Sequence, residues 1–161
     1  MAKEYRQPVY QPPKGSADLV LIRHGESMPA KPGESFPMKD GHGDPALHPQ
    51  GERQAVAVGD RLKSTHFAAA YVTKLIRTHQ TAAPLLAHLG MSATIDPDLH
   101  EVHLGDWDGG LYRIKSAQGD PAFERMRANG EWGEIPGAET TAVFHGRVEK
   151  GLRRIAAAHV D

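Results

Sequence analysis

The residues best suited to chemistry in this sequence follow two short apolar segments. Arg23 and His24 come directly after "LVLI", and Arg77 comes shortly after "AAAYV". Guanidinium groups match phosphate oxygens and offset their negative charge, and a neutral imidazole nitrogen can attack phosphorus. These residue types indicate phosphoryl transfer through a covalent intermediate on His24. A purely structural histidine at the end of a strand is the alternative at this point.

Phosphoryl transfer from an alcohol also needs an acid that protonates the departing alkoxide. Glu101 lies in "LHEVHLGDWDGG", a loop at 99–110 that is rich in glycine and aspartate and follows a predicted strand. We therefore expect Glu101 to be the proton donor. Its neighbours His100 and His103 do not form a metal-binding pattern such as His-Glu-x-x-His, so no metal site is predicted.

The elements that must position these side chains alternate between strands and helices. Strands are expected at 17–23, 67–73 and 92–97, and helices at 48–65, 75–90, 120–130 and 137–159. This order predicts an α/β fold in three layers, with a mostly parallel sheet and helices on both faces. The continuous apolar run at 17–23 is typical of a strand buried on both faces. Ligands of such sheets bind at the carboxyl ends of the strands, which would bring Arg23, His24 and Arg77 together.

Two further segments have the composition of loops or tails. The first, at 27–46, is rich in proline and glycine, and long loops of this kind are often lids or binding segments. Glu26 and Ser27, where this loop begins, are therefore candidates for contact with a substrate. Residues 1–16, rich in proline and glutamine, are interpreted as a flexible or surface-pinned tail, which leaves one domain at 17–161.

The bulk composition excludes several classes of protein. The chain has 161 residues, a net charge of −1 and no cysteine, so it has no disulfide framework and no basic field for nucleic acid or a membrane surface. Its apolar runs are too short to span a membrane, and its first residues lack the apolar core of a signal peptide. We therefore expect a soluble, cytoplasmic protein without nucleic-acid or membrane partners.

The segment "LIRHGES" resembles the signature of the histidine phosphatase superfamily, the phosphoglycerate mutase-like proteins. Four further segments are similar to family motifs in the same order: "DPALHPQGERQA", "YVTKLIRTHQTA", "LHEVHLGDWDG" and "PGAETTAVFHGRVEKGLRRI". The resemblance implies a phosphoglycerate mutase-like fold with His24 as the phosphorylated nucleophile. It also implies that Arg23 and Arg77 bind the phosphate and that Glu101 donates the proton. Neither a metal nor another cofactor is implied.

Within this family, "HEVHLGDWDG" resembles the phosphatase branch. Mutases usually carry longer, basic insertions around the loop at 99–110, which we call the acid loop because it contains Glu101. The resemblance therefore implies hydrolysis of phosphate monoesters, with a small phosphorylated metabolite as substrate. Phosphoglycerate mutase-type transfer is the nearest alternative. Both a monomer and a homodimer are compatible with the sequence.

The family also uses a second histidine, which is followed by glycine and stands after a further apolar strand. This sequence ends at Asp161, directly after the helix that should lead to that strand. His145, although followed by glycine, lies inside a helical pattern, and His159 ends the same pattern, so neither is expected to replace it. We expect a piece of a longer protein rather than a short, inactive member. A non-catalytic module that binds phosphate or a partner is the further alternative.

Overall fold

The computed structural model describes residues 4–8 and 10–160 of the chain. Residues 1–3 and 9 of the predicted tail, and Asp161 of the predicted domain, lie outside the described residues. The helices are α1 (Pro49–Leu62), α2 (Ile76–Leu89), α3 (Leu111–Gln118), α4 (Pro121–Asn129) and α5 (Thr141–Ala158). The strands are β1 (Met38–Lys39), β2 (His42–Gly43), β3 (Tyr71–Val72) and β4 (Thr94–Ile95), and the short 3-10 turns are η1 (Pro97–Leu99), η2 (Gly105–Gly110) and η3 (Trp132–Glu134).

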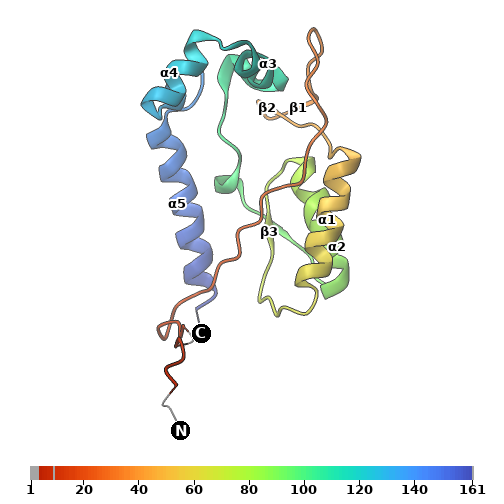
Figure 1. The fold of residues 1–161 in the computed structure, drawn as a ribbon, viewed down its shortest axis with the longest axis vertical. Helices are drawn as coiled ribbons and strands as arrows, with labels where there is room; N and C mark the ends of the chain where they lie inside the picture. The colour runs from red at the N-terminus through yellow and green to blue at the C-terminus, as the bar shows by residue number, and fades with distance from the viewer. Residues whose placement is uncertain (1–3, 9, 161) are drawn as a thin grey trace.

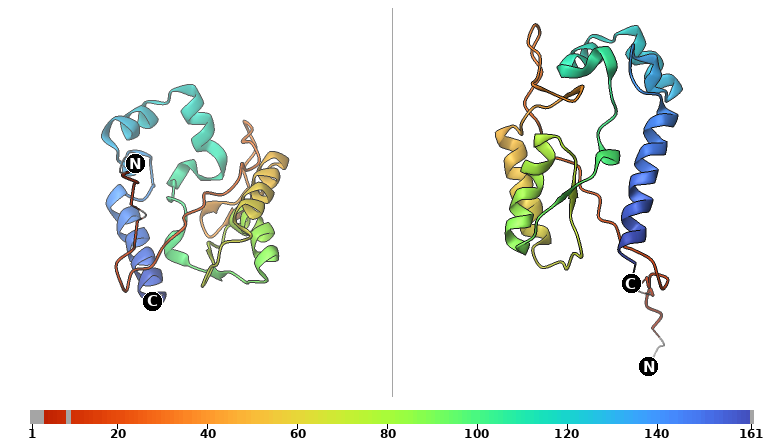
Figure 2. Two further views of the ribbon diagram at one scale, coloured as in Figure 1. Left: turned by 60° about the horizontal axis from the view of Figure 1, so that its bottom comes forward. Right: turned by 180° about the vertical axis from the view of Figure 1, so that it is seen from behind.

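The helices stand on either side of a thin central region. Helices α1 and α2 lie side by side, α5 lies on the opposite side, and α3 and α4 close one end (Figure 1, Figure 2). Between them run β3, which pairs in parallel with β4, and an extended segment that includes residues 17–23. No helix in the described part of the chain is long and apolar enough to cross a membrane.

The sheet of the predicted three-layer fold is only partly formed. The described residues form two separate two-stranded sheets, the parallel β3–β4 pair and an antiparallel β1–β2 hairpin inside the predicted loop at 27–46. The prediction of a parallel arrangement is confirmed for β3 and β4, whereas the prediction of one continuous sheet is not.

The segment at 17–23 differs most from expectation. It is extended but is assigned to no strand, and Leu21 and Val20 are 73% and 50% exposed. The prediction of a strand buried on both faces is therefore wrong for this structure. An apolar run becomes a buried strand only where neighbouring strands and covering helices surround it. Here β3 pairs with β4 and not with the segment at 17–23.

The helices that carry the site begin and end where the sequence indicates. At the start of α1, Nδ1 of His48 accepts a hydrogen bond from the amide of Gln50, and Pro49 occupies the first turn. Helix α2 ends at Leu89 and is capped by Gly90, whose φ of 64° is the left-handed conformation that favours glycine. Pro84 lies inside α2 without ending it. The predicted helices at 48–65 and 75–90 are thus confirmed.

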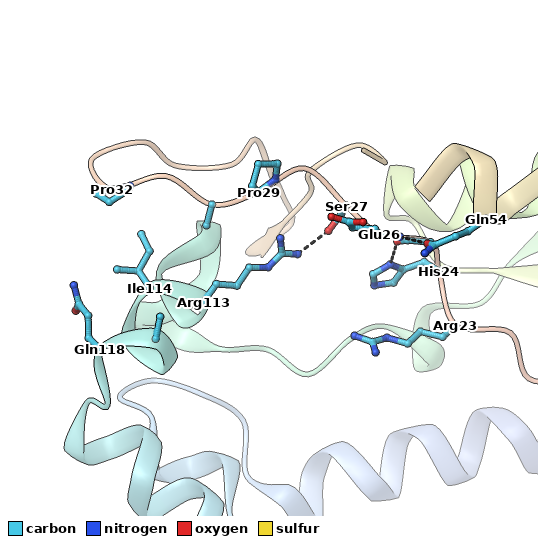
Figure 3. Close-up of a pocket in the computed structure, with 13 residues that line it drawn as sticks. Arg23, His24, Glu26, Ser27, Pro29, Pro32, Gln54, Arg113, Ile114 and Gln118 are labelled. Carbon is cyan, nitrogen blue, oxygen red and sulfur yellow. Dashed lines mark hydrogen bonds between the residues drawn. The ribbon is translucent and has the colours of Figure 1, made fainter. Parts of the chain in front are cut away.

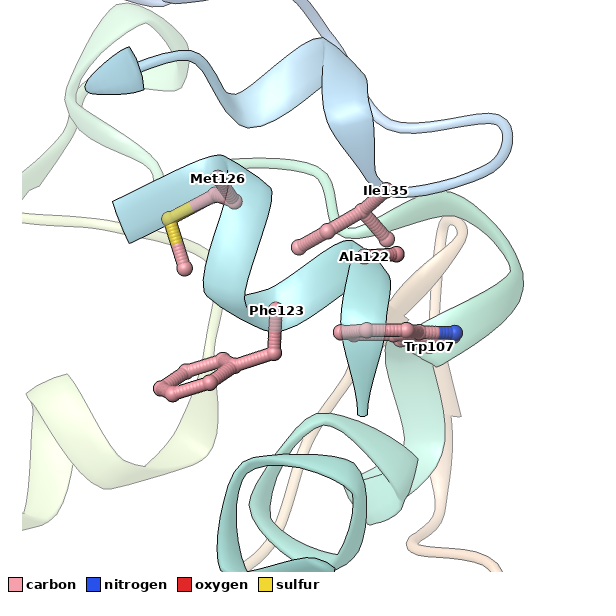
Figure 4. Packing of buried hydrophobic residues seen from close by; sticks show 5 residues of the cluster. All are labelled: Trp107, Ala122, Phe123, Met126 and Ile135. Carbon is pink, nitrogen blue, oxygen red and sulfur yellow. The ribbon is translucent and has the colours of Figure 1, made fainter. Parts of the chain in front are cut away.

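A small apolar core fixes the end of the molecule formed by η2, α4 and η3. Trp107 packs there with Ala122, Phe123, Met126 and the fully buried Ile135 (Figure 4). Because Trp107 belongs to the same loop as Glu101, this core anchors the acid loop from one side. Helix α3, which joins the loop to this core, was not predicted from the sequence.

Helix α5 confirms the helical setting predicted for the two C-terminal histidines. His145 lies inside α5 and is exposed. His159 follows the last turn of α5, where its Nε2 lies 2.8 Å from the hydroxyl of Tyr71 on β3. Neither residue lines the cavities described below.

Candidate active site

The turn after His24 is packed against both α1 and α2. The amide of Gly25 donates to Oγ1 of Thr81 on α2 at 3.1 Å, and the amide of Glu26 donates to Oε1 of Gln54 on α1 at 2.8 Å. A Cβ atom on Gly25 would lie only 2.5 Å from the carbonyl oxygen of Gly51, so this close approach requires glycine. These contacts fix the backbone that carries the imidazole of His24.

The imidazole of His24 has a defined hydrogen-bond partner and a lowered pKa. Its Nδ1 lies 2.7 Å from the carbonyl oxygen of Gly25, which can only accept, so the proton is on Nδ1 and the lone pair is on Nε2. Burial lowers the pKa of His24 below its usual value, and the charges of Arg77 and Arg23 lower it further. Both effects favour the neutral form that can attack phosphorus.

Arg77 lies in the first turn of α2 and is held by the segment that precedes α1. Only 7% of Arg77 is exposed, and its Nη1 donates to the carbonyl oxygen of Gly43 at 2.9 Å. The carboxylate of Asp44 lies 3.9 Å from the same nitrogen and also accepts from the amide of Ile76 at 2.8 Å. Asp44 therefore stabilises the start of α2, where Leu75 provides no side-chain cap.

Glu101 lies in the irregular chain between η1 and η2 and is exposed. Its Oε1 accepts from the amide of Val102 at 3.0 Å. Its charge acts on the pKa of His24, opposing the effect of the arginines, and on the pKa of Arg77. The carboxyl group thus lies within electrostatic reach of both groups.

One cavity brings the four predicted residues together. Arg23, His24, Arg77 and Glu101 all line a cavity of about 430 Å³. A second cavity of about 830 Å³ continues from Arg23 and His24 along the start of the predicted loop and α3, and Glu26 and Ser27 line it (Figure 3). The structure therefore places the predicted phosphate-binding and loop residues in two adjoining cavities.

Arg113 of α3 lines both cavities and was not predicted. Its guanidinium donates to Oγ of Ser27 at 2.6 Å (Figure 3). It also donates to the carbonyl oxygen of Met28 at 2.9 Å and lies 5.4 Å from the centre of the Phe36 ring. Ser27, only 4% exposed, is thus engaged by this arginine. Arg113 was not among the predicted site residues, because no helix was predicted at 111–118.

The histidines near the acid loop pack on one another. The ring of His42 lies 5.6 Å from that of His100 and 5.3 Å from that of His103, measured between centroids. Burial lowers the pKa of His100, which favours its neutral form. Among residues 4–8 and 10–160, no group of three or more acidic, cysteine or histidine side chains is arranged to hold a metal ion.

Known proteins resemble this chain in both sequence and shape. Residues 19–161 match the histidine phosphatase superfamily (branch 1). Phosphoglycerate mutase-like protein 4 of Arabidopsis thaliana is 32% identical over 146 residues, which are 89% of this chain and 62% of that relative. The chain thus spans less than two thirds of the length of this curated relative.

Two solved structures illustrate the likeness in shape. A mycobacterial glucosyl-3-phosphoglycerate phosphatase has a TM-score of 0.66 and 25% identity, with 84% of this chain and 62% of that one covered. The alpha-ribazole phosphatase of Shigella flexneri has a TM-score of 0.64 and 27% identity, with 83% and 64% covered. Together with the match over residues 19–161, these findings show that the chain belongs to branch 1 of the histidine phosphatase superfamily.

Proposed function

We propose that this domain hydrolyses phosphate monoesters through a phosphohistidine on His24. The observation that carries the proposal is the state of the imidazole. Nδ1 is engaged by Gly25, Nε2 carries the lone pair, and Arg23 and Arg77 line the same cavity as the ring. Attack on an anionic phosphoryl group requires a neutral nucleophile together with cationic ligands for the phosphoryl oxygens.

In the first step, Nε2 of His24 attacks phosphorus and the bond from phosphorus to the alcohol oxygen breaks. Arg23 and Arg77 bind the phosphoryl oxygens and offset the negative charge that would otherwise repel the nucleophile. Glu101 gives its proton to the departing oxygen, so a neutral alcohol leaves.

In the second step, water attacks the phosphohistidine. The Glu101 carboxylate takes a proton from this water, the N–P bond breaks, and inorganic phosphate and neutral His24 are restored. The same carboxyl group therefore acts as acid and then as base. The proposed steps draw on neither a metal ion nor an organic cofactor.

The second cavity supports a small phosphorylated metabolite as the substrate. Its walls combine apolar side chains, among them Pro29, Pro32 and Ile114, with the amides of Gln54 and Gln118. Amides donate hydrogen bonds to hydroxyl groups and accept from them, and apolar walls pack against carbon skeletons. We propose that the alcohol part of a hydroxylated phosphate ester lies in this second cavity. The solved relatives named above are, by their names, a glucosyl-3-phosphoglycerate phosphatase and an alpha-ribazole phosphatase.

Trapping of the intermediate tests the proposal. The chain is mixed with a ³²P-labelled monoester, quenched in alkali, and digested to locate the label. Label is expected on the peptide that contains His24 and is expected to be lost in His24→Ala. His145→Ala is the matched control, because His145 is exposed on α5 outside both cavities. Absence of label from His24 would instead support a non-catalytic module.

Mutase-type transfer is the second candidate, favoured by the resemblance to a phosphoglycerate mutase-like plant protein. The two activities differ in where the phosphoryl group goes. With 3-phosphoglycerate and a bisphosphoglycerate primer, a mutase forms the 2-phospho isomer, whereas a phosphatase releases inorganic phosphate. We expect inorganic phosphate.

The length of the relatives bears on the rate. The family resemblance implies a second histidine on a further strand, and the chain spans 62% of the plant relative. We therefore propose that the full site includes this histidine. A longer form that includes such a strand is expected to hydrolyse phosphate monoesters far faster than the 161-residue chain. Equal rates for the two forms would contradict this expectation.

A further inference from the structure

Arg147, in the second turn of α5, binds carbonyl groups of the predicted proton donor and of residues just before it. Its Nη1 donates to the carbonyl oxygens of Asp98 at 3.0 Å and His100 at 2.7 Å, and its Nη2 donates to that of Glu101 at 2.8 Å. One guanidinium thus holds three carbonyl groups within four consecutive residues.

Glu139, just before α5, completes the arrangement. It accepts from Nε of Arg147 at 3.1 Å and forms a second hydrogen bond with Nη2. It also accepts from the amide of His103 at 2.9 Å, and its own amide donates to the carbonyl oxygen of His103 at 3.0 Å. The side chains of Glu139 and Arg147 are only 13% and 21% exposed, so water screens this ion pair weakly.

The backbone around Glu101 has little regular structure of its own. Residues 100–104 belong to no helix or strand, and within the described part of the chain the Glu101 side chain accepts a hydrogen bond only from the neighbouring amide of Val102. Carbonyl groups that a helix or sheet would satisfy are satisfied here by Arg147. The contacts with Arg147 and Glu139 therefore define the path of the chain at the acid.

We infer that Arg147 and Glu139 are positioning residues that hold the Glu101 carboxyl at the phosphoryl site. The inference rests on the proposed role of Glu101 as proton donor. An exposed side chain on irregular backbone has many orientations, and displacement by about 1 Å is enough to weaken a catalytic group strongly. Neither positioning residue lines the cavity of His24, so both act through Glu101.

A positioning role can be distinguished from a purely structural one by comparing substrates whose leaving groups do and do not need a proton. A purely structural role would lower kcat/KM for both substrates by the same factor. Nitrophenolate leaves without a proton, whereas an alkoxide needs one. Arg147→Met is therefore expected to lower kcat/KM roughly 10- to 100-fold for glycerol phosphate and by less than about threefold for p-nitrophenyl phosphate. Glu101→Gln should show the same selective loss, and Arg147→Lys, which keeps a donor, an intermediate one.

Arg154 supplies the matched control on the same helix. It donates to the carboxylates of Asp98 and Asp96, each at 2.6 Å, and so also joins α5 to this region without touching the backbone of Glu101. Arg154→Met is expected to change both substrates by the same factor. A selective loss in Arg154→Met, or an equal loss for both substrates in Arg147→Met, would overturn the inference.

An NMR titration of His24 gives a second test that needs no turnover. Glu101 raises the pKa of His24, so displacing its carboxylate should lower that pKa, as Glu101→Gln should. Arg147→Met is expected to lower it too, whereas loss of a positive charge alone would raise it. An unchanged or raised pKa in Arg147→Met overturns the inference. By contrast, an absence of selective loss in Glu101→Gln overturns the proposed role of Glu101 itself.

Discussion

The amide of Gly25 donates a hydrogen bond to the hydroxyl of Thr81, fifty-six positions later in the chain, at 3.1 Å. The same hydroxyl donates to the carbonyl oxygen of Arg77, one turn earlier in α2, at 2.7 Å. One buried side chain thus joins the turn behind the predicted nucleophile to the helix that carries a predicted phosphate ligand.

Thr81→Val is expected to lower both stability and activity. Valine matches the shape of threonine but leaves the buried amide of Gly25 without a partner, which costs about 1–3 kcal/mol. Urea denaturation measures the free energy of unfolding, and phosphohistidine formation measures the effect on His24. Thr81→Ser keeps the hydroxyl and is the control, so a loss of the same size in the serine variant would contradict this explanation.

Gly51→Ala is expected to be destabilising because of the close approach between α1 and the turn after His24. Its Cβ would lie 2.0 Å from the carbonyl oxygen of Glu26, a backbone atom that cannot rotate away. Such overpacking typically costs about 1–3 kcal/mol. Gly146→Ala is the matched control in a helix, because nothing lies within 4 Å of its Cβ position. It should stabilise the chain by about 0.5–1 kcal/mol, and thermal unfolding distinguishes the two signs.

The imidazole of His24 is expected to titrate below the usual value of 6.5. Burial is the main cause, and the charges of Arg77 and Arg23 act in the same direction. Arg23→Met should therefore raise the pKa of His24, as followed by NMR of the imidazole. Lys63→Met, at the far end of α1, should leave it unchanged. A His24 pKa at or above 6.5 in the unchanged chain would contradict the prediction.

The same shift predicts how His24 affects stability with pH. The folded state binds the His24 proton less readily than the unfolded state, whose pKa is near 6.5. Its contribution is fully present above pH 6.5 and is lost as the pH falls through the lower folded pKa. His24→Asn does not titrate, so its stability should fall less over this window. Parallel stability curves for the two proteins would count against the shift.

The exposed apolar segment at 19–22 is expected to promote self-association. Leu21 is 73% exposed, and an extended apolar segment without strand partners pairs readily with other chains. Sedimentation velocity should show concentration-dependent species that Leu21→Lys reduces. Val143→Lys changes another exposed apolar residue, on α5, and should have little effect. A chain that stays monomeric at every concentration would contradict this prediction.

The sequence predicted four of the five α-helices in the described part of the chain, and it predicted that the chemical residues converge. The boundaries of α1 and α2 followed from local signals, namely Pro49 in the first turn and Gly90 after the last. The order of motifs placed Arg77 and Glu101 beside His24, and the structure brings all three to one cavity. These predictions depend on local chemistry and on the order of elements, both of which a single sequence contains.

What was missed depends on partners that are distant in the sequence. The apolar run at 17–23 matches a buried strand, yet burial requires neighbours that its own letters do not specify. Helix α3 has only eight residues, begins after Gly110 and exposes Leu111, so it shows no clear apolar stripe. Without α3, the contact of Arg113 with the loop could not be foreseen.

The hydrogen bonds around Arg113 affect which parts of the loop at 27–46 can vary in length. Met28 is tied to Ala46 and to Arg113, and Phe36 is tied through its amide to Gly109 at 2.9 Å. Residues 29–35 form a loop between these two hydrogen-bonded residues, so both of its ends are held in place whatever the sequence of its middle. Insertions or deletions there would reshape the wall of the larger cavity without moving His24. Variation in this wall is thereby separated from the geometry of the proposed phosphoryl-transfer site.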